Sequence, residues 1–282
     1  MVPPRLFGTD GVRGVAGERL SAELAVALGR AVAAEARAER PQVLIVRDTR
    51  ESGPMLESGL AAGIAQGGGD ALIGGILPTP AASILVRRLG LDLAAVVSAS
   101  HNPWRDNGIK FFGPDGAKLP DDAEARIEAA VAGSGGPAAA IGTIRELRGA
   151  LDDYLRELAT AFGDDLSGLT VVLDCANGAT YRAAPAIFER LGARVTTLCA
   201  DPDGRNINEG CGSTHPERLA ATVRERGADL GLAYDGDGDR VIAVDGTGEV
   251  RDGDELIALI ATHMAERGEL GGGVAVTVMS NY

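Results

Sequence analysis

The chain has 282 residues, of which 45% are hydrophobic and 24% are charged, and this length suits two α/β units that each have their own core. The 40 acidic residues outnumber the 27 basic ones, and the net charge of −13 argues against a protein that binds nucleic acid or anionic membranes. No run approaches the roughly 20 apolar residues that a membrane span needs. Three cysteines without a CxxC pair, and an N-terminus without a secretion pattern, indicate reduced thiols and a cytoplasmic protein.

Apolar runs rich in β-branched residues alternate with alanine-rich amphipathic stretches along the chain. In chain order these predict a helix (20–38), a strand (42–46), a helix (55–66), a strand (71–73), a helix (80–89), a strand (93–97) and a boundary loop (133–137). The pattern then restarts with a helix (151–162), a strand (170–173), a helix (179–191), a strand (195–198), a helix (216–226), a strand (230–234), an extended run (241–244), a helix (252–267) and a strand (274–279). The predicted fold class is α/β, with two α/β/α domains built on mostly parallel mixed sheets.

The last predicted elements are one helix and one strand, which cannot bury a core by themselves. They either dock on the second unit or open a third, truncated domain, and we favour the second interpretation. The expected domains are therefore 1–145, 146–250 and the start of a third at 251–282.

Two loops follow predicted strands, where ligands bind in open α/β sheets. The first, at 98–118, contains Ser100, His101, Asn102 and both lysines of the chain, Lys110 and Lys118. A serine at a strand end is a nucleophile when a base or cation activates it, but the same residue types also suit a plain polar turn. No hydrolase elbow GxSxG occurs here.

The second loop is acidic and carries Asp235, Asp237 and Asp239, separated by glycines and followed by Arg240. Glycines let the backbone curl so that three carboxylates face one centre, which suits a hard divalent cation. The residues that follow do not fit an EF-hand. A catalytic Mg²⁺ with open coordination positions is favoured over a plain acidic turn.

A third segment, at 7–14, places glycines around a polar stretch that contains Arg13. Backbone N–H groups and an arginine fork can hold an anion, although a structural turn fits the composition equally well. The segment has neither the order of a P-loop nor that of a dinucleotide-binding fingerprint.

Taken in order, these segments resemble the α-D-phosphohexomutase family: FGTDGVRG at 7–14, SASHNP at 98–103 with NGIKFF at 107–112, and DGDGDR at 235–240. Within the family, NIN at 206–208 and GCGSTH at 210–215 are similar to the phosphoglucosamine mutase branch. That branch interconverts glucosamine 6-phosphate and glucosamine 1-phosphate for cell-envelope precursors. The alternatives are a sister mutase acting on mannose or glucose phosphates and a non-catalytic module that binds Mg²⁺ or a phosphosugar.

The resemblance implies a role for each matched residue. Ser100 carries the phosphoryl group, and the oxygen at this position joins the three aspartates as a ligand of one Mg²⁺. Lys110 and His101 assist proton transfer and charge stabilisation, and Arg13 helps to order the site. Arg240 and Asn102 belong to the phosphate-binding set. The implied partner is a small hexosamine phosphate, and the oligomeric state is not indicated.

Members of the family have four domains, whose third and fourth carry a GExSGH-type sugar loop and an RxSGTEP-type phosphate loop. Neither loop occurs in this sequence. The resemblance is therefore to the N-terminal portion of a mutase, and we expect little turnover from it without those loops.

Overall fold

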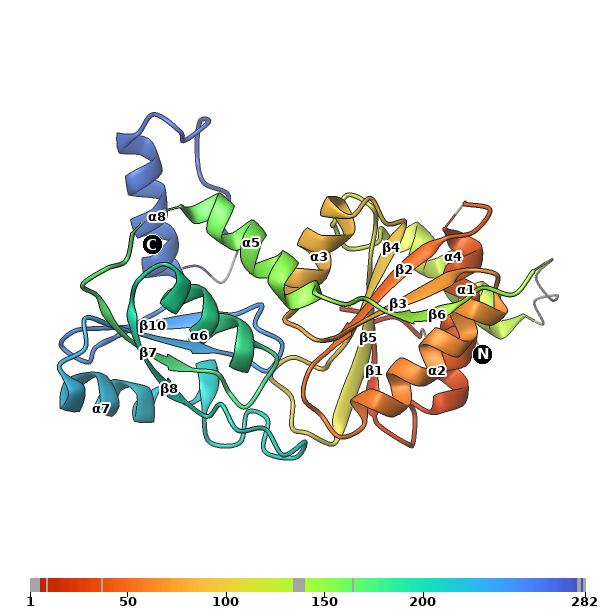
Figure 1. The fold of residues 1–282 in the computed structure, drawn as a ribbon, viewed down its shortest axis with the longest axis horizontal. Coiled ribbons are helices and arrows are strands. Elements are labelled where there is room, and N and C mark those ends of the chain that lie inside the picture. Colours follow the sequence, from red (N-terminus) through yellow and green to blue (C-terminus); the bar gives the residue numbers. More distant parts are fainter. Residues whose placement is uncertain are drawn as a thin grey trace.

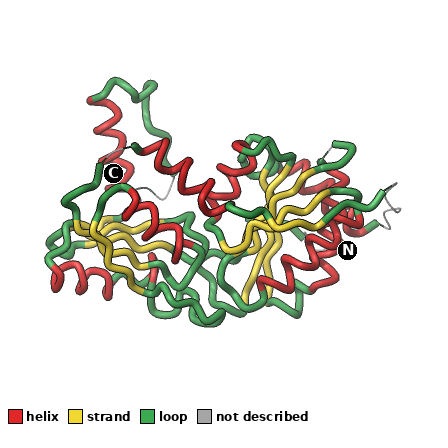
Figure 2. The backbone as a smooth tube through the Cα atoms, in the orientation of Figure 1, coloured by secondary structure: helices red, strands yellow, loops and turns green. Residues whose placement is uncertain are grey.

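Two mixed β-sheets lie beside each other, and helices cover their faces (Figures 1 and 2). The structure is a computed structural model, and it describes residues 6–8, 10–36, 38–133, 140–163, 165–277 and 280. No helix in this part of the chain combines the length and the apolar character needed to cross a membrane. The predicted α/β class with mixed sheets is confirmed.

The first sheet has six strands in the order β1-β5-β4-β2-β3-β6. Its strands are β1 (Val12–Val15), β2 (Gln42–Arg47), β3 (Asp70–Ile76), β4 (Leu93–Val97), β5 (Asp106–Phe112) and β6 (Ile144–Glu146). The pairs among β4, β2, β3 and β6 are parallel, whereas β5 runs antiparallel to both β4 and β1. All five residues of β4 are buried because helices cover both faces of the sheet, which explains its continuous apolar run.

The helices divide between the two faces of this sheet. One face packs against α1 (Ala22–Glu35), α2 (Gly53–Gln66) and α4 (Asp121–Ala132). The other face packs against α3 (Thr79–Arg88) and α5 (Ala150–Phe162). Along β2, Val43 and Ile45 contribute to the first core, and Leu44 and Val46 to the second.

The second sheet has five strands in the order β11-β10-β9-β7-β8. Its strands are β7 (Thr170–Asp174), β8 (Arg194–Leu198), β9 (Leu230–Tyr234), β10 (Val241–Asp245) and β11 (Val250–Arg251). The core on one face includes α6 (Thr180–Arg190), and α7 (Glu217–Arg226) packs on the other. A short 3₁₀ helix, η1 (Gly212–Thr214), lies against the end of β9.

Each sheet has apolar clusters of its own, and one further cluster is shared between the two units. This cluster contains residues of α3 from the first unit together with residues of α5 and α6 from the second unit. Tyr154 and Leu155 of α5 and Ile187 of α6 are buried in this cluster. The shared cluster therefore packs α6, which covers the second sheet, against helices of the first sheet, and this contact helps to position the loops described below.

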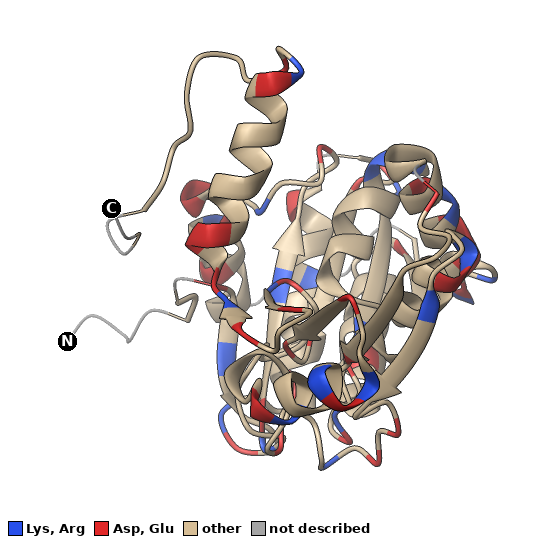
Figure 3. Cartoon of the chain, turned by 90° about the vertical axis from the view of Figure 1, so that its left-hand side faces the viewer, with Lys and Arg blue, Asp and Glu red and all other residues tan. Residues whose placement is uncertain are grey.

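The helix α8 (Gly253–Glu266) agrees with the predicted helix, and a capping box of Asp252 and Glu255 begins it. None of its residues is buried. Figure 3 shows it projecting from the body of the molecule, with charges at its ends and an uncharged middle. That middle includes Leu259 and Ile260, which are 67% and 59% exposed.

The predicted strand at 274–279 is wrong for residues 274–277, which form no strand; residues 278 and 279 lie outside the described residues. A buried strand requires neighbours, and no described strand pairs with this apolar run. Most of the predicted boundary loop at 133–137 also lies outside the described residues. The sequence prediction treated 98–118 as a loop, whereas β5 occupies its middle and pairs with β4.

Candidate active site

The candidate active site lies where the carboxyl ends of β4 and β9 meet between the two sheets. Ser100 follows β4, is 1% exposed and donates its hydroxyl hydrogen to Oδ2 of Asp235 at 2.5 Å. The backbone of Ser100 has φ of 54°, a left-handed conformation that is uncommon for any residue except glycine. Such a conformation persists only where the surrounding structure holds it, and it is common at functional sites, so it supports a functional role for this loop.

Arg50 holds the serine loop, which we define as residues 98–105 between β4 and β5. Its guanidinium is fully buried, forms an ion pair with Asp48 at 2.8 Å, and donates to four main-chain oxygens of the serine loop and the start of β5. These oxygens belong to Ser100, Asn102, Pro103 and Asp106. Asp48 also accepts from Ser98 Oγ at 2.6 Å, and Ser98 Oγ accepts from the Ser100 N–H at 3.0 Å. Arg50 and Asp48 therefore fix the backbone that presents Ser100.

Glycines allow the acidic loop, residues 235–240, to approach the serine loop closely. A Cβ atom on Gly236 would lie 2.6 Å from the Ser100 carbonyl oxygen, a distance that a side chain cannot accept. Gly238 has φ of 68°, which glycine adopts without steric penalty. Thr79 anchors the loop from the first unit, because its N–H and hydroxyl donate to Asp237 O at 2.8 Å and Oδ2 at 2.7 Å.

The three aspartates of the acidic loop have carboxylate oxygens within 4.8 Å of one another. Burial and repulsion by Asp237 raise the pKa of Asp235 to about 7. Burial also acts to raise the pKa of Asp237, but the ammonium of Lys110 outweighs it and the pKa is lowered. Asp237 Oδ1 is buried and has no hydrogen-bond partner among the described residues. An unpaired buried oxygen within a carboxylate cluster fits a divalent cation, which would satisfy it.

Lys110 comes from β5 and lies beneath the acidic loop, 3% exposed. Its Nζ is 2.8 Å from Asp237 Oδ2, 3.2 Å from Asp239 Oδ2 and 3.4 Å from Asp10 Oδ2. Burial alone would lower the pKa of Lys110, but attraction by these carboxylates outweighs burial and raises it. The side chain is therefore an ammonium ion at neutral pH and acts on the site through its charge.

A pocket of about 460 Å³ opens beside the serine loop. Its lining includes Arg13, Arg19, Arg240 and His101, so three guanidinium groups face one space. Planar guanidinium groups bind phosphate oxygens in pairs, and this pocket therefore suits a phosphorylated ligand. Burial and the charges of Arg240 and Arg13 lower the pKa of His101, whose Nδ1 lies 3.5 Å from Ser100 Oγ. A neutral imidazole at this position can accept a proton.

The structure brings together the predicted catalytic, metal-binding and phosphate-binding residues except Asn102, and the second lysine of that loop, Lys118, pairs with Glu124 of α4. Asn102 donates to Asp106 Oδ2 at 2.9 Å and does not line the arginine pocket, so its geometry favours support of the serine loop over phosphate binding. Arg13 pairs with Asp10 at the edge of the pocket.

Sequence reasoning missed several residues of the site. Asp48 and Arg50 were not singled out from the sequence, although they follow the predicted strand at 42–46 closely, and a position at the carboxyl end of a strand was the available signal. Arg19 carried no local pattern. Asn208 donates its amide to the Ser100 carbonyl oxygen at 3.0 Å, a contact between residues 108 positions apart that no local spacing predicts.

Comparison with known proteins agrees with this geometry. Residues 4–135 match the sequence profile of the phosphoglucomutase/phosphomannomutase α/β/α domain I, and residues 152–248 match that of domain II. The chain belongs to the phosphoglucomutase/phosphomannomutase family. The serine, acidic and N-terminal segments therefore occur in a member of the family that they resembled.

Among curated relatives, the phosphoglucosamine mutase of Moorella thermoacetica is 54% identical over 99% of this chain and 64% of its own length. The phosphoglucosamine mutase of Desulforudis audaxviator is 51% identical over 98% of this chain and 63% of its own length. The chain thus spans about 64% of the length of these relatives. A crystal structure of a phosphoglucomutase/phosphomannomutase family protein from Burkholderia thailandensis superimposes with a TM-score of 0.84 at 30% identity, covering 95% of this chain and 60% of that one.

Proposed function

We propose that this chain carries the phosphoryl-transfer centre of a phosphoglucosamine mutase. The observation that carries the proposal is the contact of Ser100 Oγ with Asp235 Oδ2 at 2.5 Å, beside a pocket lined by three arginines. A buried hydroxyl, a carboxylate cluster and an anion pocket are the parts that phosphoryl transfer needs, because that reaction depends on positioning and charge stabilisation.

We further propose that Asp235, Asp237, Asp239 and the oxygen on Ser100 hold one Mg²⁺. The unpaired Oδ1 of Asp237 supports this set, since a hard cation prefers carboxylate oxygens. When bound, Mg²⁺ would offset the charge of a phosphoserine, about −1.5 to −2 at neutral pH. Lys110 remains an ammonium beside two of these carboxylates and contributes positive charge from below.

The proposed reaction exchanges a phosphoryl group between Ser100 and a hexosamine phosphate. A sugar hydroxyl attacks the phosphorus of the phosphorylated Ser100 and gives its proton to His101, while the new P–O bond forms and the bond to Ser100 Oγ breaks. The released Ser100 oxygen takes up a proton, and a bisphosphate sugar results. After this sugar reorients, the reverse transfer returns its other phosphate to Ser100. The arginine pocket holds the phosphate that does not react.

His101 is the proposed proton acceptor for the attacking hydroxyl, because its lowered pKa leaves it neutral and it lies next to Ser100. Lys110 is assigned to electrostatic stabilisation, because its raised pKa leaves it charged. The His101→Gln variant should lose activity in a pH-dependent manner, whereas Lys110→Arg should retain part of it.

Glucosamine phosphates are the proposed substrates because curated relatives that are 54% and 51% identical to this chain are named phosphoglucosamine mutases. We also propose that α8 begins a third domain. Its exposed Leu259 and Ile260 support this, since an apolar helix face is normally covered, and the relatives are longer than this chain. A cytoplasmic location is consistent with three free cysteines.

Mass spectrometry of the 282-residue chain after incubation with Mg²⁺ and a hexosamine 1,6-bisphosphate tests the proposal. We expect one phosphate on the peptide that contains Ser100, absent in Ser100→Ala and present in the matched control Ser58→Ala, whose exposed hydroxyl lies on α2. Turnover of glucosamine 6-phosphate should remain low compared with the longer relatives. Phosphate on another residue, or none in a folded protein, would exclude Ser100 as the phosphoryl carrier.

A further inference from the structure

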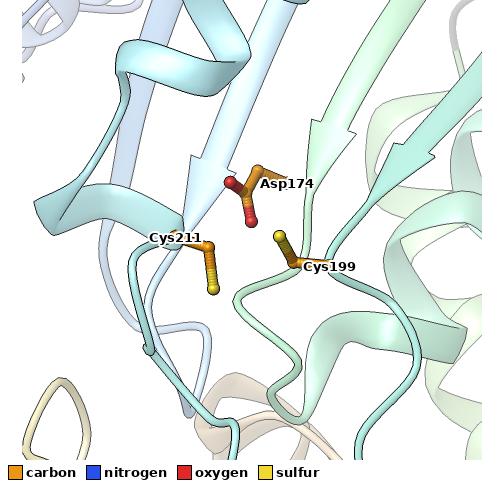
Figure 4. A group of neighbouring side chains, drawn as sticks. All are labelled: Asp174, Cys199 and Cys211. Carbon is orange, nitrogen blue, oxygen red and sulfur yellow. The ribbon is translucent and has the colours of Figure 1, made fainter.

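A second cluster of metal-ligating side chains lies in the second unit, outside the centre described above. Asp174 ends β7, Cys199 follows β8 directly, and Cys211 precedes η1. One carboxylate oxygen and the two sulfur atoms all lie within 4.8 Å of one another. Figure 4 shows the carboxyl group of Asp174 directed into the space between the two cysteines. Asp174 and Cys199 are brought together because β7 and β8 are parallel neighbours whose carboxyl ends coincide, and Cys211 reaches them from the position before η1.

Asp174 is the unusual member of this cluster. Its side chain is 0% exposed, and only Oδ1 is satisfied, by the N–H of Ala176 at 2.9 Å. Oδ2 is buried, and no hydrogen bond of acceptable geometry reaches it from the described residues. A buried carboxylate oxygen without a partner is costly in free energy unless a proton or a cation satisfies it. This oxygen therefore marks a position in the cluster that a proton or a bound cation would satisfy.

The charges around the cluster also suit a divalent cation. Two thiolates and one carboxylate around a divalent ion leave a net charge of −1. Arg218 lies next to the cluster and donates its Nη1 hydrogen to Cys199 Sγ at 3.7 Å, so its positive charge compensates for that excess. Cys199 is partly exposed, which gives an ion a route from solvent, whereas Cys211 is buried.

We propose that Asp174, Cys199 and Cys211 bind a thiophilic divalent transition metal such as Zn²⁺. Two sulfurs and one carboxylate oxygen form a donor set that zinc accepts, and the ligand atoms of tetrahedral zinc lie about 3.5 Å apart. Small side-chain rotations bring atoms within 4.8 Å to that separation. The donors differ from the all-oxygen set of the acidic loop, so the two sites select different metals.

The position of this site links it to the serine loop. Residues 200–210 lie between Cys199 and Cys211, and this segment makes several contacts with the first unit. Arg205 pairs with Glu51 at 2.7 Å, and Asn208 donates to the Ser100 carbonyl oxygen at 3.0 Å. A metal bound at the base of the segment closes it into a short loop and restricts its motion. The metal is a structural clip for the segment and takes no part in the transfer step.

Titration of the whole chain with Co²⁺ and Cd²⁺ in a phosphine reductant tests the proposal, because thiolate ligands give sulfur-to-metal charge-transfer absorption that carboxylates do not. We expect one equivalent of metal to saturate the signal. Cys199→Ala and Cys211→Ala should abolish it, and Asp174→Asn should weaken binding by tenfold or more. The matched control is Cys175→Ala, which removes the third thiol and should leave the signal intact.

Two further measurements extend the test, and the first uses the unmodified chain and so does not depend on the folding of a variant. In the unmodified chain, saturating Cd²⁺ should slow alkylation of Cys199, read by peptide mass spectrometry. Replacing Asp235 with asparagine should leave the charge-transfer signal unchanged, because the acidic loop contributes no sulfur. A folded unmodified chain without sulfur-to-metal absorption at saturating metal would overturn the proposal, as would a signal that survives in both cysteine variants. Neither result depends on whether Ser100 accepts phosphate.

Discussion

Replacement of Arg50 by methionine (Arg50→Met) should destabilise the first unit strongly, because the buried partners of this guanidinium have no solvent that could replace it. Arg50 and Asp48 are both 0% exposed and form an ion pair at 2.8 Å. The Arg50→Met change keeps much of the apolar volume but leaves the Asp48 carboxylate unpaired. Four main-chain oxygens of the serine loop and β5 also lose their donor.

The magnitude follows from the asymmetry of buried ion pairs. Removing one partner of such a pair leaves an uncompensated buried charge and reduces the free energy of unfolding by about 3–5 kcal/mol. Burial already raises the pKa of Asp48, and loss of Arg50 removes an interaction that lowers it. When folding raises the pKa of a carboxyl group, the folded protein becomes less stable as pH rises from the pKa of that group in the unfolded chain towards its pKa in the folded chain. The deficit of Arg50→Met should therefore be larger at pH 8 than at pH 5.

Urea unfolding followed by tryptophan fluorescence measures this effect, since Trp104 is the only tryptophan and lies in the serine loop. Linear extrapolation of the transition gives the free energy of unfolding for each variant. The control is Arg205→Met, because the Arg205 ion pair with Glu51 is exposed and should contribute about 0–1 kcal/mol. A loss below about 1 kcal/mol for Arg50→Met, or equal losses for both variants, would refute the reasoning.

Three further predictions concern the acidic loop. Because the pKa of Asp235 is raised to about 7 without metal, protons compete with Mg²⁺ for this carboxylate below that pH. Calorimetry should show that the affinity for Mg²⁺ rises from pH 6 to pH 8, and a flat profile would contradict the assignment. Lys110→Met should lower the midpoint of thermal unfolding. Added Mg²⁺ should raise that midpoint more in the variant than in the unmodified chain, because the cation replaces the lost ammonium; an equal rise in both would argue against a shared site. Gly236→Ala should reduce phosphate incorporation at Ser100 at least tenfold, because its Cβ would lie 2.6 Å from the Ser100 oxygen, whereas Gly253→Ala meets no atom within 4 Å and should have no effect.

The sequence predicted those parts of the site whose chemistry is local. Asp235, Asp237 and Asp239 stand within five positions, and their carboxylates converge because the intervening glycines permit a tight turn. Ser100 follows an apolar strand, so its place at a sheet edge could be inferred. Arg50 was not assigned to the site, since the serine-loop oxygens to which it donates lie 50 and 52 residues away in sequence and an arginine is ordinarily expected on the surface.

The fold shows the same division between local and distant information. Strongly periodic helices such as α8 were predicted within one residue at each end. The strand β5 was missed because its sequence, DNGIKFF, begins with turn-forming residues and gains its conformation by pairing with β4. The run at 274–277 was assigned to a strand on apolar character alone, although conformation there depends on a neighbour that periodicity does not reveal.

The apolar cluster shared by α3, α5 and α6 has a consequence for how this protein tolerates mutation. Ser100 belongs to the first unit and the three aspartates belong to the second. Their alignment therefore depends on the packing of apolar side chains in this cluster, which do not contact a ligand. Replacing Tyr154 or Ile187 with a smaller residue should thus reduce phosphoryl transfer although neither residue lies in the site. Variants that impair function are expected in this cluster as well as in the serine and acidic loops.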